Sequence, residues 1–239
     1  MASSEDANPV VLMKRIEATE GWKVMSRIHI HATSYRVFKG NYEEIHRALE
    51  AYHNPEIGLP LWEVKNRAKL DLFRREMVRL VHNYVASAKS LFEHTRKFVK
   101  EYYSNSAFEK EYLRKVDETF HDPFSSLVIQ LRDYTLHNDL PTISANLLFE
   151  PNKPFRFRIL LDVASLRKWS RWSAKSKEYL KTLGPELELD LVVDDYNTKV
   201  TSFYEWFGRQ LQPLHTKELA ETETLLERLR ELTAGDVIS

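Results

Sequence analysis

Apolar residues recur every three or four positions over most of this chain, which predicts a mostly α-helical fold. The clearest stretch begins at Pro60 and ends near Tyr103, and it predicts one helix of roughly 40 residues. Pro60 suits the first turn of that helix, because the first turn has no acceptor for a backbone N–H. Ser104–Ser106 predicts a break that supplies a new N-cap, and a second helix follows over Ala107–Phe120.

A third, shorter helix is predicted from Pro123 through Leu136. Asp122 has the side chain of an N-cap, and Asn138 is placed to end the helix in the left-handed conformation. Pro141 then prevents the helix from continuing. The sequence therefore predicts a helix with two sharply defined ends.

A β-hairpin is predicted after this helix. Two stretches rich in β-branched and aromatic residues, 142–149 and 155–161, flank the proline-containing segment 150–154. Helical patterns then resume, and they predict an additional set of flanking helices. These are a helix over Leu166–Thr182 with Ser165 as its N-cap, a long helix reaching about Leu211, and a charged amphipathic helix that follows Pro213 and ends near Leu232.

The first 60 residues have a less regular pattern. Arg27–His31 alternates between polar and apolar residues like a strand, whereas the apolar residues within Tyr42–His53 follow a helical period. We expect three parts along the chain. Residues 1–60 form a partly helical N-terminal arm or subdomain, residues 61–141 form a helical core, and residues 142–239 add the hairpin and C-terminal helices that pack on it.

The composition is that of a folded protein. The chain has 239 residues and a mass of 28.2 kDa, and its 43% hydrophobic residues are enough for a sizeable core. Lys plus Arg (35) equals Asp plus Glu (35), so any binding to nucleic acid has to come from a local cluster of cations. Six glycines disfavour glycine-rich phosphate loops, and the lack of cysteine excludes thiolate nucleophiles and cysteine-ligated metals.

No stretch of the sequence approaches the roughly 18 apolar residues of a membrane span. The first apolar run, Val10–Met13, is too short for a signal peptide. We therefore expect a cytoplasmic protein with no membrane partner. His29 and His31 would share one face of the predicted strand and could bind a metal there, but no third ligand is evident. We accordingly expect no metal site and no cofactor.

The residues best suited to chemistry are Arg132, Asp133 and His137, within the string Leu131–Pro141 at the end of the third helix. Histidine accepts and donates protons near neutral pH, and arginine binds a phosphate through two parallel hydrogen bonds. Four other arginines precede a histidine at a comparable spacing, but the residue that follows each of them is not aspartate. These pairs are Arg47 with His53, Arg75 with His82, Arg114 with His121 and Arg209 with His215.

The string resembles the motif of HEPN domains, which are helical bundles in which four to six residues separate an arginine from a histidine and a polar residue directly follows the arginine. The resemblance covers roughly residues 61–141. It implies an HEPN-like bundle with metal-independent endoribonuclease activity, of the kind found in toxin–antitoxin and phage-defence systems. It also implies that Arg132, Asp133 and His137 are catalytic, that RNA is the substrate, that a homodimer brings two motifs together, and that an antitoxin protein is a further partner.

Two features keep a non-catalytic interpretation open. Asp133 stands where the family more often has asparagine, and a carboxylate beside a phosphate is electrostatically unfavourable. The equal numbers of cations and anions also give the chain no general attraction for RNA. The competing hypothesis is a catalytically inactive helical module that dimerises or binds a protein partner.

A local cluster of cations lies between Lys153 and Lys181, where nine lysines and arginines accompany only two carboxylates. Trp169 and Trp172 are interleaved with them. Cations that hold phosphates beside rings that stack on bases suit single-stranded RNA. Two tryptophans three residues apart also fit the buried stripe of an amphipathic helix whose basic face is solvated. The candidate RNA-binding residues are Arg156, Arg158, Arg167, Lys168 and Arg171.

Overall fold

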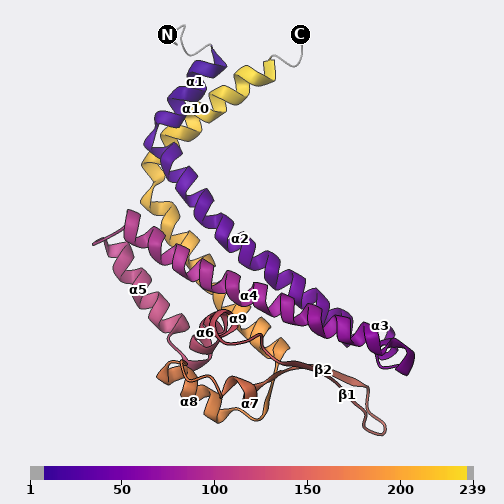
Figure 1. Cartoon of the computed structure of the whole chain (residues 1–239). Helices are drawn as coiled ribbons and strands as arrows, with labels where there is room; N and C mark the ends of the chain where they lie inside the picture. The colour runs from indigo at the N-terminus through magenta and orange to yellow at the C-terminus, as the bar shows by residue number, and fades with distance from the viewer. Residues whose placement is uncertain (1–7, 236–239) are drawn as a thin grey trace. The chain divides into compact units, whose positions relative to one another are not determined.

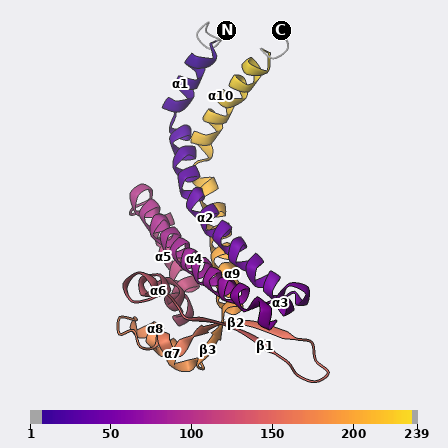
Figure 2. The same cartoon turned by 45° about the vertical axis from the view of Figure 1, so that its right-hand side comes forward.

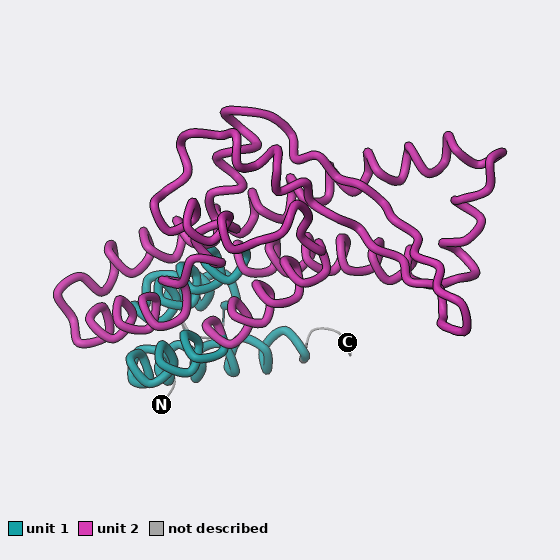
Figure 3. The backbone as a smooth tube through the Cα atoms, turned by 90° about the horizontal axis from the view of Figure 1, so that it is seen from below, with its two compact units in different colours: residues 1–33, 205–239 teal, residues 34–204 magenta. Residues whose placement is uncertain are grey.

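The computed structural model describes residues 8–235, and this part of the chain contains ten α-helices and one small antiparallel sheet (Figure 1). The mostly α-helical class and the β-hairpin expected from the sequence are confirmed. The chain divides into two compact units (Figure 3): unit 1 consists of residues 1–33 and 205–239, and unit 2 of residues 34–204. The division of the sequence at residues 60 and 141 stays a prediction, because the units are defined by contacts in space and not by order along the chain.

Helices of very different length follow one another along the chain. They are α1 (Pro9–Ala18), α2 (Glu20–His53), α3 (Pro55–Leu61), α4 (Arg67–Tyr102), α5 (Ala107–Phe120), α6 (Pro123–His137), α7 (Val163–Leu166), α8 (Ala174–Thr182), α9 (Leu189–Leu214) and α10 (Thr216–Gly235). A 3₁₀ turn over Val64–Asn66 precedes α4. The strands, which pair in chain order, are β1 (Ile143–Leu148), β2 (Arg156–Asp162) and β3 (Glu186–Glu188).

Local sequence signals decide where α5 and α6 begin. Ser106 Oγ accepts the backbone N–H of Glu109 at 3.1 Å, so the predicted N-cap of α5 is confirmed. Asp122 Oδ1 accepts the backbone N–H of Ser125 at 3.0 Å and caps α6 as predicted. Asn138 does end α6, but its φ of −128° is not left-handed, so that detail of the prediction is wrong.

The long helix α4 begins later than the sequence pattern predicts. Pro60 lies inside α3, a separate short helix that Asn54 caps. The side-chain amide of Asn66 donates to the carbonyl oxygen of Pro60 at 2.8 Å and stabilises the connection between the two helices. α4 therefore spans 36 residues from Arg67, and the predicted start is wrong because the apolar period continues through the break.

The predicted strand at Arg27–His31 is wrong, since these residues lie within the 34-residue helix α2. Five residues are too few to separate an alternating pattern from a helical one. Along the helix, the buried residues His31, Phe38 and Ile45 are seven positions apart, which corresponds to two turns. Ile30, which is 71% exposed, is an apolar residue on the outer face and produced the misleading alternation.

Unit 2 has a continuous apolar core formed mainly by α2, α4, α6, α9 and β2. Tyr84 of α4 is buried in this core, and its hydroxyl donates to the carbonyl oxygen of Val193 at 3.0 Å, so its polar atom is satisfied. Gly58 allows α3 to approach β2 closely. A Cβ at this position would overlap with the carbonyl oxygen of Tyr52 and with the ring of Phe157.

β1 and β2 form a hairpin whose turn projects from unit 2 in both views (Figure 2). Leu148 pairs with Arg156 next to the turn. β3 adds a third antiparallel strand, in which Glu188 pairs with Leu160. The sequence did not predict β3, because three residues are too few to define an alternating pattern.

The predicted single helix over residues 166–182 is wrong, because the short helix α7 already ends at Leu166 and α8 begins only at Ala174. Ser165 does not cap a helix; its hydroxyl donates to Asp162, whose carboxylate caps α7. Ser173 caps α8 by accepting the backbone N–H of Ser176 at 3.2 Å. The intervening residues 167–173 belong to neither a helix nor a strand.

Unit 1 contains α1 and α10 with the adjoining ends of α2 and α9. α1 buries Leu12 and Ile16. Gly21 allows α2 to approach α10, since a Cβ there would overlap with the backbone carbonyl of Glu218. The two predicted C-terminal helices are confirmed as α9 and α10, with Pro213 inside the last turn of α9. Each helix within residues 8–235 is either too short or too polar to cross a membrane.

Candidate functional site

α6 carries the candidate catalytic residues, and its neighbours in unit 2 hold it in place. The carboxylate of Asp122 at its N-terminus accepts from Lys199 Nζ of α9 at 2.6 Å. Burial would raise the pKa of Asp122, but the hydrogen bonds from Lys199 and Ser125 outweigh it and hold the pKa below its ordinary value. One side of α6 is buried in the core. Its buried apolar residues are Leu127, Val128, Leu131 and Tyr134.

Arg132, Asp133 and His137 lie on the outer side of α6. Arg132 Nη1 donates to Asp133 Oδ1 at 3.0 Å, and the two side chains are 37% and 35% exposed. His137 is the last residue of the helix and is exposed. Five positions along an α-helix correspond to a rotation of roughly 140°, so Arg132 and His137 lie on either side of Asp133. The structure therefore joins Arg132 to Asp133 but does not bring Arg132 and His137 together within one helix.

The histidines of the other four arginine–histidine pairs are all engaged or buried. His53 and His121 lie within ion-pair distance of Asp190 and Asp117, respectively. His82 has a ring nitrogen that is buried without a hydrogen-bond partner, and burial lowers the pKa of His215. Among the five pairs, which all lie within the described residues, only the histidine that closes α6 is both exposed and without an ion-pair partner.

An open groove of about 630 Å³ borders the end of α6. It is formed by α4 and by the segment 139–143 that leaves α6. Asp139 lines the groove two residues after His137, so the backbone of His137 lies within about 7 Å of that wall. Arg74 and Arg75 line the opposite wall, and Arg74 is 3.4 Å from the carboxylate of Asp71. The groove is large enough for a ligand of nucleotide size.

Three of the five candidate RNA-binding residues have structural partners. Arg156 Nη2 and Arg158 Nε donate to Glu188 Oε1 at 2.8 and 2.7 Å, which ties β2 to β3. Arg167 donates to the backbone carbonyls of Leu180 and Leu183 and so satisfies acceptors at the C-terminus of α8. The other two candidates, Lys168 and Arg171, are exposed, and no ion pair engages them within the described residues.

Trp169 and Trp172 are buried, with 8% and 4% of their surface exposed. The buried alternative considered for these residues is therefore correct, although the two rings lie in the irregular segment 167–173 and not on a helix. Both rings contact Tyr134 of α6: the ring of Trp172 stacks on it with centroids 5.6 Å apart, and that of Trp169 meets it edge-on at 5.7 Å. Neither indole is available to stack on an RNA base.

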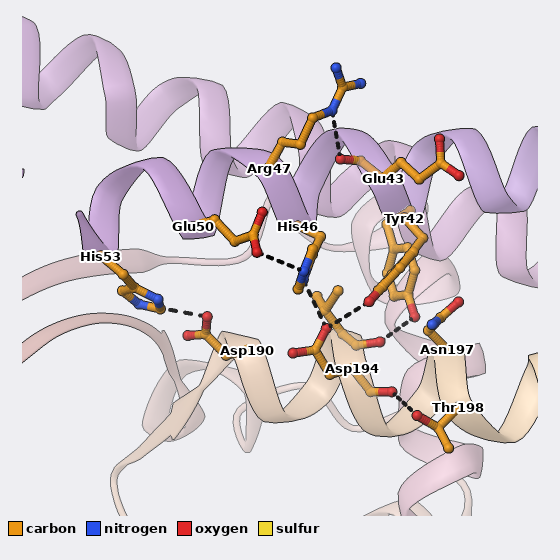
Figure 4. Close-up of polar contacts among 12 residues, drawn as sticks. Tyr42, Glu43, His46, Arg47, Glu50, His53, Asp190, Asp194, Asn197 and Thr198 are labelled. Atoms are coloured by element: carbon orange, nitrogen blue, oxygen red, sulfur yellow. Dashed lines mark hydrogen bonds and ion pairs between the residues drawn. The ribbon is translucent and has the colours of Figure 1, made fainter. Parts of the chain in front are cut away.

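A second group of titratable side chains lies where α2 meets α9 within unit 2, and we call it the α2–α9 seam (Figure 4). The ring of His46 lies between two carboxylates, with Nδ1 3.1 Å from Asp194 and Nε2 3.4 Å from Glu50. The hydroxyl of Tyr42 donates to Asp194 at 3.2 Å. Burial and the charge of Asp194 raise the pKa of Tyr42. The seam is therefore a network of hydrogen bonds and close histidine–carboxylate contacts on the surface of unit 2.

The sequence contains a signal for this seam that is separate from the arginine–histidine motif and was not part of the predictions above. Tyr42, His46 and His53 recur at helical spacing on α2, and Asp190 and Asp194 do so on α9. Burial raises the pKa of Asp190, whose carboxylate is 3.6 Å from His53. A polar stripe on each of two helices predicts a shared polar contact only once the two helices are known to be neighbours.

Within residues 8–235, no three histidine, aspartate or glutamate side chains are grouped closely enough to hold a metal ion. His29 and His31 lie on a helix and not on a strand, so two positions separate them by roughly 200° and they do not share a face. Comparisons with protein-family models, curated proteins and solved structures find no match to this chain.

Proposed function

We propose that this chain is a metal-independent endoribonuclease similar to HEPN-domain nucleases, with its site at the end of α6. One observation carries the proposal: His137 is exposed and unpaired at the terminus of a helix that is otherwise held firmly by the core of unit 2. The open groove beside it supplies room for a nucleotide. The chemistry of RNA cleavage asks for little more than a proton acceptor, a proton donor and a cation.

In the proposed reaction, an imidazole takes the proton of the ribose 2′-hydroxyl, and the 2′-oxygen attacks the adjacent phosphorus. The bond from phosphorus to the 5′-oxygen breaks, and that oxygen receives a proton, so the products are a 2′,3′-cyclic phosphate and a free 5′-hydroxyl. His137 serves as the acid or base, and Arg132 holds the non-bridging oxygens of the phosphate. Asp133 orients Arg132 through the 3.0 Å hydrogen bond between them.

A homodimer is part of this proposal. One histidine cannot easily serve both the attacking and the leaving oxygen, which lie on opposite sides of the phosphorus. The rotation of roughly 140° between Arg132 and His137 also keeps them from acting together within one copy of α6. Two copies related by a two-fold axis supply the missing groups to each other. An antitoxin protein that covers the same surface would fit a role in a toxin–antitoxin or phage-defence system.

The experiment that tests the proposal is cleavage of single-stranded RNA by the purified full chain in EDTA. The wild type is compared with His137→Ala and Arg132→Ala, and with His121→Ala as a matched control. His121 also follows a helix and pairs with Asp117, and it lies just before the N-terminus of α6, at the opposite end of that helix from His137. We expect cleavage by the wild type and the control but not by the other two variants. Equal cleavage by all four proteins, or by none of them, would contradict the proposal.

A specific observation favours a second candidate, a catalytically inactive helical module for dimerisation or protein binding. The guanidinium of Arg132 is already bound by Asp133, and most cations of the stretch 153–181 have internal partners. Asp133→Asn distinguishes the two candidates. Asparagine keeps an oxygen that can accept from Arg132 and orient it, and it removes the negative charge beside the substrate phosphate. A nuclease should therefore gain activity, whereas an inactive module should gain none.

A further inference from the structure

The segment 167–173, which we call the basic loop, is fixed against α6 by its aromatic residues. The ring of Trp172 stacks on Tyr134 with an interplanar angle of 9°, and its Nε1 donates to the carbonyl oxygen of Leu166 at 2.7 Å. The ring of Trp169 lies 4.7 Å from that of Trp172. Both indoles are buried, whereas the side chains of Lys168, which precedes Trp169, and Arg171, which lies between the two tryptophans, are exposed to solvent.

The basic loop lies on the same side of α6 as His137. The backbone N–H of Ser173 donates to Gln130 Oε1 at 2.9 Å, and the hydroxyls of Ser173 and Ser126 are 3.1 Å apart. Ser126, Gln130, Tyr134 and His137 follow one another at spacings of four, four and three residues, so they form one stripe along the helix. Arg132 is roughly 140° away from His137, toward the other side.

Lys168 and Arg171, the two exposed cations of the basic loop, differ from the cations around them because no hydrogen bond or ion pair engages their side chains within the described residues. Arg167 is bound to backbone carbonyls, and Arg156 and Arg158 are bound to Glu188. The carboxylate nearest to Lys168 in sequence, that of Asp162, accepts both the N–H and the hydroxyl of Ser165, and the one nearest to Arg171, that of Glu178, accepts from Lys181. The bonds from Ser165, together with the charge of Lys168, hold the pKa of Asp162 below its ordinary value, so this carboxylate remains ionised but engaged.

We propose that the basic loop binds the phosphate backbone of the RNA strand, with Lys168 and Arg171 supplying cations on the His137 side of α6. This inference rests on the proposed function for the identity of the polymer as RNA. Phosphates and not bases are recognised, because the two indoles that could have stacked on bases are buried. Binding through the loop is therefore independent of base sequence and weakens with salt.

The test measures binding to a single-stranded RNA of mixed sequence by fluorescence anisotropy over a range of salt concentrations. The full chain with His137→Ala serves as the background, so that the strand stays intact. We expect the added pair Lys168→Ala with Arg171→Ala to weaken binding about tenfold, since each removes a charge-assisted contact. The slope of log Kd against log salt should fall by about 1.4, at about 0.7 for each phosphate contact on a single strand.

The matched control is the pair Lys153→Ala with Lys181→Ala, which removes the same charge from the same stretch. These two lysines are bound to Glu150 and Glu178, so their loss should leave Kd and slope nearly unchanged. Lys168→Ala combined with Arg171→Lys should bind RNA more tightly than the loop pair, because lysine at position 171 keeps the charge. A single-stranded DNA of the same sequence should depend on the loop in the same way, since its phosphates are equivalent.

Three results would overturn the inference: equal loss of affinity in the loop pair and the control pair, unchanged Kd and slope in the loop pair, or no binding of RNA by the background protein. The failure of the proposed function is a separate result. If cleavage does not depend on His137 but the loop pair binds RNA more weakly, the proposed function fails and the loop remains an RNA-binding surface. If cleavage depends on His137 but the variant Lys168→Ala with Arg171→Ala binds RNA normally, only the proposal about the loop fails.

Discussion

At the scale of single residues, exposure without an ion-pair partner distinguishes His137 from the other four described histidines that share its spacing from an arginine. Pattern matching finds five arginine–histidine pairs, and four of those histidines have a structural partner or are buried. An exposed histidine that makes no contact needed for folding is accessible to a ligand. For the same reason, the folded protein should tolerate substitution of His137.

His137→Ala should change the free energy of unfolding by no more than about 0.5 kcal/mol, because the side chain is exposed and packs against nothing in the core. Urea unfolding followed by circular dichroism measures this change. A loss of several kcal/mol would mean that the side chain has a structural role, and any loss of activity in the variant would then have to be attributed to unfolding.

Asp122 illustrates the opposite case, a residue whose contribution is to stability and depends on pH. Its pKa is held below the ordinary value of 3.8, because hydrogen bonds from Lys199 and Ser125 outweigh burial. A carboxyl group with a lowered pKa stabilises the folded state above its unfolded pKa, and this contribution is lost as the pH falls through the folded pKa.

Asp122→Asn should therefore lower the free energy of unfolding at pH 7 by about 0.5–1 kcal/mol, since asparagine keeps the N-cap but loses the partly exposed ion pair with Lys199. Asp122→Ala should cost about 1 kcal/mol more, because the cap is lost as well. The difference between wild type and Asp122→Asn should shrink below pH 3.8, the ordinary pKa of the group. A difference that stays constant with pH would contradict this assignment.

At the scale of elements, packing determines which helices tolerate an added methyl group. Gly40 lies in the middle of α2 with no atom within 4 Å of where its Cβ would be. Gly58 lies in α3, where a Cβ would overlap with the backbone of Tyr52 and the ring of Phe157. The same substitution is thus predicted to have opposite effects in two helices of unit 2.

Gly40→Ala should raise the free energy of unfolding by about 0.5–1 kcal/mol, because alanine loses less backbone entropy in a helix. Gly58→Ala should lower it by about 1–3 kcal/mol through overpacking of α3 against β2. Thermal unfolding of the two variants beside the wild type measures both effects. Stabilisation of both variants would show that α3 and β2 leave room for the added methyl group, and destabilisation of both would contradict the prediction for Gly40.

At the scale of the whole molecule, a site shared between two copies makes a prediction that a site within one chain does not. Arg132 and His137 point to different sides of α6, and one histidine cannot easily serve both the attacking and the leaving oxygen, so the proposed nuclease needs groups from two copies. Light scattering should accordingly give twice the 28.2 kDa mass of the chain at micromolar concentration. A strict monomer would be incompatible with this arrangement.

Mixing wild type with an equal amount of the inactive His137→Ala should halve the cleavage rate after subunit exchange, because a dimer with one intact His137 lacks either the acid or the base. Random exchange lowers the share of fully intact dimers from one half to one quarter. The same mixture measured before exchange is the control, with exchange verified by differently tagged chains. An unchanged rate after exchange would show that one His137 is enough for a working site.

Features that depend on neighbours along the chain are predictable from the order of the residues. The helical period, the N-caps Ser106 and Asp122, and the turn of the β1–β2 hairpin all follow from interactions within a few residues. The end of α6 near Asn138 was predictable for the same reason, and so was the position of the candidate motif over the last six residues of the helix.

Tertiary structure alone decided which polar groups are free. Arg156, Arg158 and Arg167 read as cations available to RNA, yet their partners, Glu188 and the carbonyl of Leu180, lie 13 to 32 residues away in sequence. The burial of Trp172, the third strand β3 and the α2–α9 seam likewise depend on contacts between distant segments. The sequence shows which polar groups each residue carries, but the packing of the chain determines whether those groups form hydrogen bonds with a protein partner or with water.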